Sequence, residues 1–206
     1  MFIKIDSMLW VRTPNIVQKS FPKVIWEMNE EAKALVKMPI CTFSGKKIYL
    51  TFDDGPHPII TPWVLEQLKA NNVKATFFCL GEHIEKYPEI FEQIKKDGHT
   101  IGNHGYKHYN GWRISRKNYL ENYQKGKAIS GSNLFRPPYA KVRAMDKFTK
   151  GEIVICTVLP HDYHPKVTPE KCLENIQNHL RDNDILVLHD NEKAWTKLQY
   201  ILPKCL

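Results

Sequence analysis

Two adjacent aspartates, Asp53 and Asp54, and two histidines four residues apart, His104 and His108, have side chains that could bind a divalent metal ion. The His-x-x-x-His spacing lets both imidazoles face one ion from a single turn of chain. One added carboxylate gives three protein ligands with a position left for water, which is typical of hydrolytic zinc sites. Adjacent aspartates do not easily aim both carboxylates at one point, so one could bind metal while the other acts as a general base. Taken alone, each segment is weak, because Asp-Asp-Gly-Pro is more often a plain turn.

The positions of these residues relative to predicted strands strengthen the hypothesis. The aspartates follow a predicted strand at 47–52, and the histidines follow another at 99–102. Three further reactive side chains stand at strand ends: Arg136 in 133–136, Asp162 after 152–158, and His189 after 184–188. Active sites of barrels and open α/β sheets assemble at the carboxyl ends of parallel strands. The sequence therefore predicts a single site at that edge.

Strand and helix patterns alternate from about residue 47 onward, which is typical of βαβ units and a parallel sheet. A sixth strand is predicted at 74–79, and helices are predicted at 63–70, 88–97, 115–129, 171–180 and 191–202. Thr61-Pro62 and Thr168-Pro169 each read as an N-cap followed by proline. A regular eight-stranded barrel usually needs about 250 residues. We therefore expect an α/β fold, an irregular TIM-like (β/α) barrel with fewer than eight regular strands, with a flat doubly wound sheet as the alternative.

Length and composition indicate one domain at 47–206, preceded by an N-terminal extension, 1–46, that packs on the barrel. The net charge of +8 suits anionic partners, but a solvated basic surface is the preferred explanation. The five cysteines form no CxxC pair, so a disulfide framework or cysteine-ligated zinc is not expected, and Cys79 and Cys156 read as core residues. His57, His83, His99 and His179 read as surface or packing residues.

No apolar run is long enough for a transmembrane segment, and the amino terminus does not resemble a secretory signal. These features predict a cytoplasmic protein and leave peripheral membrane or cell-envelope association open. The oligomeric state is not predicted.

Five segments resemble the motifs of one family. They are Thr51–Pro56 (TFDDGP), His104–His108 (HGYKH), Arg136–Tyr139 (RPPY), Asp162-Tyr163 and Val187–His189 (VLH). In this order they resemble polysaccharide deacetylases with a NodB-homology domain, carbohydrate esterase family 4, over residues 47 to 202. The resemblance implies a metal-dependent hydrolase that removes acetyl groups from N-acetylated, possibly O-acetylated, sugars of a poly- or oligosaccharide.

The resemblance also implies a role for each motif residue. Asp54, His104 and His108 would hold one divalent ion, usually zinc, with cobalt or nickel as alternatives. The catalytic residues would be Asp53 as the base that deprotonates the attacking water, Arg136 as its charged partner, His189 as the acid, and Asp162 as the residue that orients His189. Tyr139 would bind the oxyanion through its backbone N–H, and Val187 would line the acetyl pocket. Trp112, beside the metal histidines, is a candidate for stacking on sugar, whereas Trp63 and Trp195 fit helix packing.

The sequence departs from the family pattern at Gly105, Ala140, Cys156 and Tyr163, where Ser or Thr, Gly, Trp and Trp are usual. Gly105 is expected to loosen His108, because a loop-ordering hydroxyl is lost. His161 and His164, which flank Asp162, are read as surface residues, substrate contacts or extra ligands.

Three alternatives stay open. The departures around Asp162 and Gly105 suggest a family member that binds glycan without hydrolysis, whereas the intact set of polar residues argues against it. Two histidines and one carboxylate also suit iron and oxygen chemistry, although this leaves Asp53, Arg136 and His189 without roles. Nucleic-acid binding is suggested by charge alone, and no motif supports it, so no nucleic-acid partner is expected.

Overall fold

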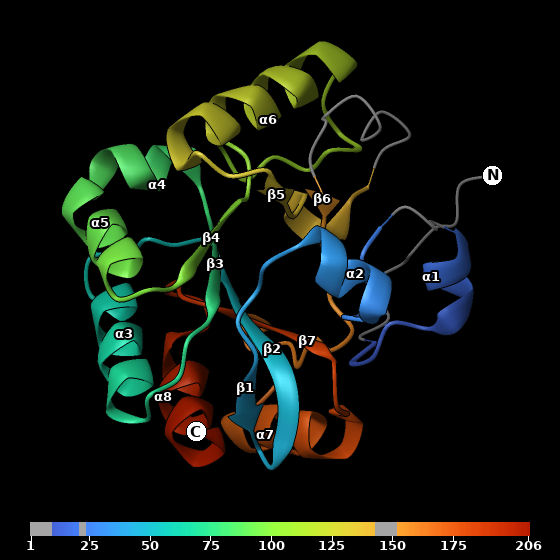
Figure 1. The fold of residues 1–206 in the computed structure, drawn as a ribbon, viewed down its shortest axis with the longest axis vertical. Coiled ribbons are helices and arrows are strands. Elements are labelled where there is room, and N and C mark those ends of the chain that lie inside the picture. The colour runs from blue at the N-terminus through green and yellow to red at the C-terminus, as the bar shows by residue number, and fades with distance from the viewer. Residues whose placement is uncertain (1–9, 21–23, 143–151) are drawn as a thin grey trace.

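The computed structural model describes residues 10–20, 24–142 and 152–206, and its centre is a curled, mainly parallel sheet (Figure 1). Within these residues six parallel strands run in the spatial order β7-β2-β3-β4-β5-β6. Their bounds are β2 Lys46–Asp53, β3 Thr76–Cys79, β4 Thr100–Asn103, β5 Leu134–Phe135, β6 Glu152–Ile153 and β7 Ile185–His189. A short strand, β1 (Cys41–Phe43), pairs antiparallel with the start of β2. The predicted α/β fold, an irregular TIM-like barrel with fewer than eight regular strands, is therefore confirmed.

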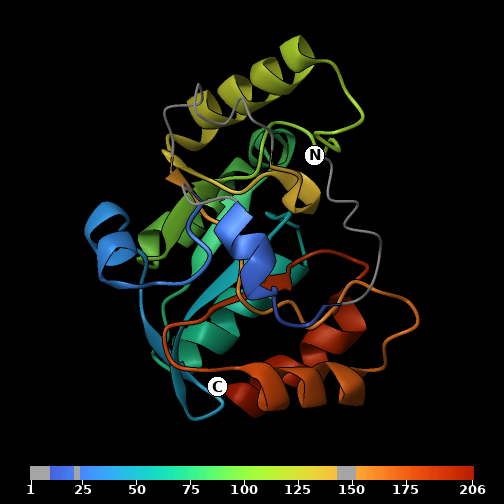
Figure 2. The same cartoon turned by 90° about the vertical axis from the view of Figure 1, so that its right-hand side faces the viewer.

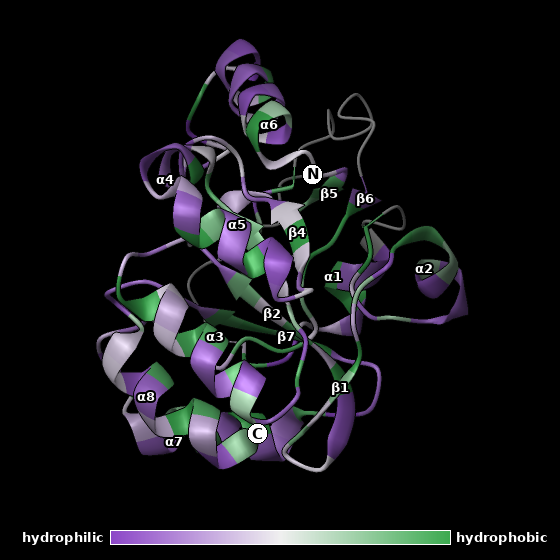
Figure 3. Ribbon diagram, turned by 60° about the vertical axis from the view of Figure 1, so that its left-hand side comes forward, coloured by the Kyte–Doolittle hydropathy of each residue, from purple (hydrophilic) through white to green (hydrophobic). Residues whose placement is uncertain are grey.

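Helices surround this sheet (Figures 1 and 3). They are α1 Asn15–Ser20, α2 Glu30–Leu35, α3 Ile60–Ala70, α4 Gly81–Lys86, α5 Pro88–Lys96, α6 Arg116–Ser130, α7 Pro169–His179 and α8 Trp195–Cys205, with a 3₁₀ turn, η1, at Pro138–Ala140. Ser115 and Thr168 cap α6 and α7 as predicted, each accepting a backbone N–H three residues ahead. Trp63 and Trp195 pack edge to face between α3 and α8.

Strand β2 lies at the centre of the core, because β3 and β7 flank it and six of its eight residues are buried. Its Phe52 stacks on Phe77 of β3 with ring centroids 5.0 Å apart. A strand buried on both faces is typical of parallel sheets covered by helices. This packing fixes the backbone at the carboxyl end of β2, where the aspartate pair lies.

Residues 11–13 and residue 25 lie beside the chain that follows β6 and hydrogen-bond to it. Ile25 forms a parallel bridge with Val154, and Arg12 forms an antiparallel bridge with Val158. Arg12 also forms an ion pair with the buried carboxylate of Asp184 at 2.5 Å. Figure 2 shows α1 lying over this side of the sheet. Residues 1–9, on which the expectation about location partly depends, lie outside the described residues.

Two predicted boundaries are wrong, and side-chain hydrogen bonds explain both. The strand predicted at 152–158 is regular only at 152–153, because the Arg136 guanidinium takes the carbonyls of Val154 and Ile155. Helix α3 begins at Ile60, one residue before the predicted cap Thr61. The N–H of Ile60 donates to Nδ1 of His57, so the Thr61 hydroxyl does not cap the helix. Thr61 donates its hydroxyl proton to Asp190.

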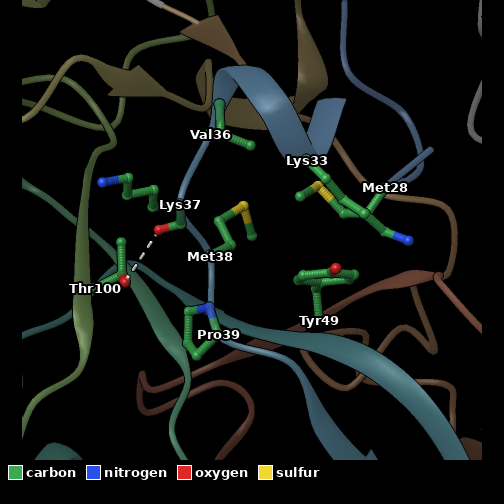
Figure 4. A pocket seen from close by; sticks show the side chains of 8 residues that line it. All are labelled: Met28, Lys33, Val36, Lys37, Met38, Pro39, Tyr49 and Thr100. Atoms are coloured by element: carbon green, nitrogen blue, oxygen red, sulfur yellow. Dashed lines mark hydrogen bonds between the residues drawn. The ribbon is translucent and has the colours of Figure 1, made fainter. Parts of the chain in front are cut away.

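A hollow of about 500 Å³ opens beside the amino ends of β2 and β4, at the edge opposite the predicted site (Figure 4). It is lined by Met28, Lys33, Val36, Lys37, Met38, Pro39, Tyr49 and Thr100. The lining has no carboxylate, histidine or cysteine, so it offers no ligands or bases for the predicted hydrolysis. Among the residues with described positions, no helix is both long and apolar enough to cross a membrane.

Candidate metal and catalytic centre

The carboxyl ends of β2, β4 and β7 bring the predicted residues together. Asp53 closes β2 opposite Phe78 of β3 and opposite His189 of β7. Asn103 ends β4, so His104 follows the strand directly and His108 lies four residues further on. Residues separated by more than a hundred positions in the sequence thus share one edge of the sheet, as the strand-end argument predicts.

Asp54, His104 and His108 form a cluster whose candidate ligand atoms all lie within 4.8 Å of one another. Oδ1 of Asp54 lies 3.3 Å from Nε2 of His108 and 3.5 Å from Nε2 of His104. Two tetrahedral zinc ligands, each at about 2.0–2.1 Å from the ion, are separated by roughly 3.3 Å. The observed separations therefore fit a cation between these three side chains.

The hydrogen bonds of the cluster leave the metal-facing atoms available. Nδ1 of His104 donates to the backbone carbonyl of Arg136 at 2.7 Å, so its Nε2 retains a lone pair. Oδ1 of Asp54 is buried and, among the described residues, accepts no hydrogen bond. A buried carboxylate oxygen without a partner is costly unless a cation or donor satisfies it. The residues present therefore fit a divalent ion.

Electrostatics also favour an ionised Asp54 and a neutral His108. Burial opposes the charge on Asp54, but the neighbouring His189, His104 and His108 lower its pKa below the ordinary value. Burial, with the charge of His104, lowers the pKa of His108 to about 4. A carboxylate and a neutral imidazole are the forms that bind metal.

The backbone around Asp54 is held in an uncommon conformation by several contacts. Asp54 has φ +85°, in the left-handed region, and its N–H donates to the carbonyl of Phe78. His83 donates from Nδ1 to the Asp54 carbonyl at 2.7 Å, so this histidine packs against the site rather than at the surface. The next N–H, of Gly55, donates to Asp190. The turn that carries Asp54 is thus fixed on both sides.

Asn191 is a site residue that sequence reasoning missed. Its Nδ2 donates to Oδ2 of Asp54 at 2.6 Å, while its Oδ1 accepts the N–H of Ala194. One oxygen of the carboxylate is thereby occupied, and the other is directed to the two histidines. Asn191 directly follows the His189-Asp190 pair, and this position next to a motif was the only signal in the sequence.

Replacing Asn191 with alanine is expected to lower the affinity for zinc by about 10- to 100-fold, because the orientation of a ligand carboxylate is lost. Competition against a chromophoric chelator measures this affinity without any assay of activity. Asn178→Ala is the matched control, since Asn178 lies exposed on α7. Equal affinities in wild type and Asn191→Ala would contradict the assignment.

Asp53 and Arg136 form a buried ion pair beside this cluster. Nη1 of Arg136 donates to Oδ1 of Asp53 at 2.6 Å and to the Thr51 hydroxyl at 2.8 Å. The remaining guanidinium donors reach backbone carbonyls, and the group lies 4.0 Å above the Phe78 ring. The second oxygen of Asp53 lies 4.0 Å from Nε2 of His104 and faces the cluster. This geometry leaves one carboxylate oxygen directed into the site.

His189 and Asp162 form a second charged pair, close enough to Asp54 for the two to interact electrostatically. Nδ1 of His189 donates to Oδ1 of Asp162 at 2.8 Å, and the backbone N–H of His189 donates to the second oxygen at 2.7 Å. Burial alone would lower the pKa of His189, but Asp162, with smaller contributions from Asp54 and Asp53, raises it to about 9. His189 can therefore carry a proton at neutral pH.

Asp190 is another buried carboxylate that the sequence did not reveal. It accepts hydrogen bonds from Gly55 and Thr61. Burial raises the pKa of Asp190 to about 7, because the hydrogen bonds only partly offset the loss of solvation. A Cβ at Gly55 would lie 2.1 Å from the Asp190 carboxylate, so this position accepts only glycine.

The departure at Gly105 has a local explanation, whereas the structure gives none for Ala140. Gly105 has φ +86°, and a Cβ there would lie 2.5 Å from the Asn122 amide. Asn122 accepts the N–H of Lys107 and donates to its carbonyl, and Asn103 accepts the N–H of Gly105. Two asparagines therefore order this loop without a hydroxyl at position 105, and the expectation that Gly105 loosens His108 stays a prediction. Ala140 also has a positive φ, +52°, where glycine is easier to accommodate.

The remaining predicted residues lie around this centre. Tyr139, 57% exposed, has φ +59° and packs its ring edge to face against His108 at 4.4 Å. Val187 is buried in the same apolar cluster as Cys156 and Val17. Trp112 is 41% exposed in the loop after His108. His161 is buried beside Tyr163, so a surface position for it is wrong.

Comparison with known proteins places this centre in context. Residues 41–147 match the family model described as polysaccharide deacetylase. A peptidoglycan-N-acetylglucosamine deacetylase of Bacillus cereus is 41% identical over 106 residues, which cover 48% of this chain and 38% of that protein. A chitooligosaccharide deacetylase of Azorhizobium caulinodans is 35% identical over 163 residues, 72% of this chain and 76% of that protein. The solved structure of peptidoglycan deacetylase PdaC from Bacillus subtilis has a TM-score of 0.67 at 30% identity, over 76% of this chain and 81% of that chain.

Proposed function

Because this chain belongs to the polysaccharide deacetylase family, we propose that it is a metal-dependent hydrolase that removes acetyl groups from N-acetylated sugars of a poly- or oligosaccharide. The observation that carries the proposal is the arrangement of three groups at one sheet edge. A three-ligand cluster at Asp54 lies beside the Asp53–Arg136 pair and near the His189–Asp162 pair. Amide hydrolysis needs an electrophilic carbonyl, a base for the attacking water and an acid for the departing amine, and this arrangement offers a group for each.

Asp54, His104 and His108 would hold the ion, which we propose is zinc. When bound, the ion supplies Lewis-acid polarisation of the acetyl carbonyl and makes nearby water more acidic. Two imidazoles and one carboxylate are donors that zinc accepts readily. Cobalt and nickel suit the same donors, so the preference among these ions is part of the test.

We propose that Asp53 takes the proton from the attacking water. Its Oδ1 is held by Arg136, so the free Oδ2 has a fixed direction toward the cluster. The oxyanion that forms on the former carbonyl needs a donor in place before the reaction. The backbone N–H of Tyr139 has no acceptor among the described residues, and the Tyr139 ring contacts His108. This N–H is therefore our proposed donor.

We propose that His189 donates a proton from Nε2 to the departing amine. Its Nδ1 is engaged by Asp162, so Nε2 is the atom that can carry the transferable proton. The ring edge of Tyr163 lies against His189, with centroids 5.0 Å apart, in the position where the family usually has tryptophan. Val187 would line the space for the acetyl methyl group.

Acetate release from N-acetylglucosamine oligomers and from peptidoglycan tests the function. We expect activity that is lost after metal removal with a chelator and is restored by zinc or cobalt. Activity that persists in protein stripped of metal would contradict metal dependence. Protein that binds one ion per chain but releases no acetate from any N-acetylated glycan would instead favour glycan binding without hydrolysis.

A further inference from the structure

A group of cationic and aromatic side chains lies beside the candidate centre and has no role in the steps above. It consists of Trp112, Arg113 and Lys141, which we call the cationic rim. Trp112 follows His108 by four residues, and Lys141 follows Tyr139 by two. Because the ring of Tyr139 contacts His108, the rim lies next to the place where the acetylated sugar would bind.

The parts of the rim hold one another in place. Nζ of Lys141 lies over the Trp112 ring, 4.2 Å from its centroid. Nε1 of Trp112 donates to the backbone carbonyl of Val142 at 3.0 Å, which ties the loop after His108 to the segment after η1. Trp112 remains 41% exposed, so an aromatic surface and an ammonium group are presented together.

Among the residues whose positions the structure describes, no carboxylate compensates the positive charge of the rim. Within the described residues, neither Lys141 nor Arg113 forms an ion pair with an acidic side chain. Partial burial, and then the charge of Arg113, lower the pKa of Lys141. Between residues 105 and 142 the sequence has eight Lys or Arg residues and one acidic residue, Glu121, which pairs with Lys117. A bound anion would relieve the repulsion between these two cations, whereas a neutral sugar would not.

We propose that the cationic rim is a subsite for a saccharide unit that bears a carboxylate, next to the sugar that loses its acetyl group. The sugar ring would pack on Trp112, and its carboxylate would lie between Lys141 and Arg113. This inference rests on the proposed function and deepens it, because it assigns the protein to acidic N-acetylated glycans rather than neutral ones. A charged pair at such a partly exposed site corresponds to an affinity about five- to tenfold higher for the acidic saccharide than for the neutral one.

A matched pair of substrates tests the inference. One is an N-acetylated oligosaccharide whose neighbouring units carry free carboxylates, and the other is the same oligosaccharide with those carboxylates amidated. We expect wild-type protein to bind the acidic form about five- to tenfold more tightly in calorimetry, and the difference should shrink as salt is added. Acetate release from both forms is measured in parallel, with the preference expected in KM rather than kcat.

The variant Lys141→Gln is expected to lose most of the preference for the acidic form. Lys125→Gln is the matched control, because Lys125 on α6 also lies over an aromatic ring, Tyr106 at 3.4 Å, but outside the rim. Equal affinity of wild-type protein for both forms would overturn the inference. So would a Lys141→Gln variant that weakens both forms equally, since that result indicates a structural role. Tighter binding of the acidic form without acetate release would support the rim and contradict the proposed hydrolysis.

Discussion

The variant Asp53→Asn is expected to lower kcat for N-acetylglucosamine oligomers by about 10²- to 10⁴-fold, the range typical of losing a positioned general base. Asparagine has nearly the same size and can still accept the Arg136 hydrogen bond, but its amide cannot take a proton from water. Asp53 is not one of the three clustered ligands, so zinc content is expected to remain near one per chain. Steady-state acetate release, with metal content measured on the same preparation, provides the test.

Asp182→Asn is the matched control for this experiment. Asp182 is an exposed aspartate before β7, at the opposite edge of the sheet, where it accepts the N–H of Lys47. Its substitution is expected to leave kcat unchanged. If Asp53→Asn retained the wild-type kcat with a full complement of metal, Asp53 would not be the base.

The sequence predicted which residues meet in the site because each of them lies at the end of a strand. Such strands are recognised from a few consecutive residues. Runs such as Lys46–Asp53 and Ile185–His189 have the residue types of buried strands, and parallel strands place their carboxyl ends at one edge. The fold class and the convergence of Asp54 with His104 and His108 follow from this rule. The assignment of a role to each single residue came from the motif resemblance and stays a prediction.

The residues that hold the framework in place could not be predicted in the same way. Asn191 reaches Asp54, and Asp190 reaches Gly55, across more than 130 residues of sequence. Such contacts depend on tertiary distance and have no periodic signature. The shortened β6 has the same cause, because Arg136 takes carbonyls that a strand neighbour would otherwise use. The amino-terminal part of the sequence lacks a clear period, and there Arg12 and Ile25 each form an isolated bridge instead of belonging to a regular strand.

The pKa of His189 determines how activity should depend on alkaline pH. Burial would lower this pKa, and Asp162 raises it to about 9, so the imidazole is protonated at neutral pH and loses its proton as pH rises through about 9. An acid that must donate a proton is inactive once deprotonated. We therefore expect amide hydrolysis to fall on the alkaline side. Without the charge of Asp162, as in Asp162→Asn, the fall is expected at lower pH.

The variant His189→Gln is expected to separate two classes of substrate. Hydrolysis of an N-acetyl group requires protonation of the amine, so its rate should fall by about 10²- to 10⁴-fold. The nitrophenolate released from 4-nitrophenyl acetate is stable without a proton, so the rate for this ester should fall less than about tenfold. The two losses are compared at one pH and with equal metal content. Equal losses on amide and ester would mean that His189 acts through the metal cluster or the fold, because only a proton donor distinguishes between leaving groups.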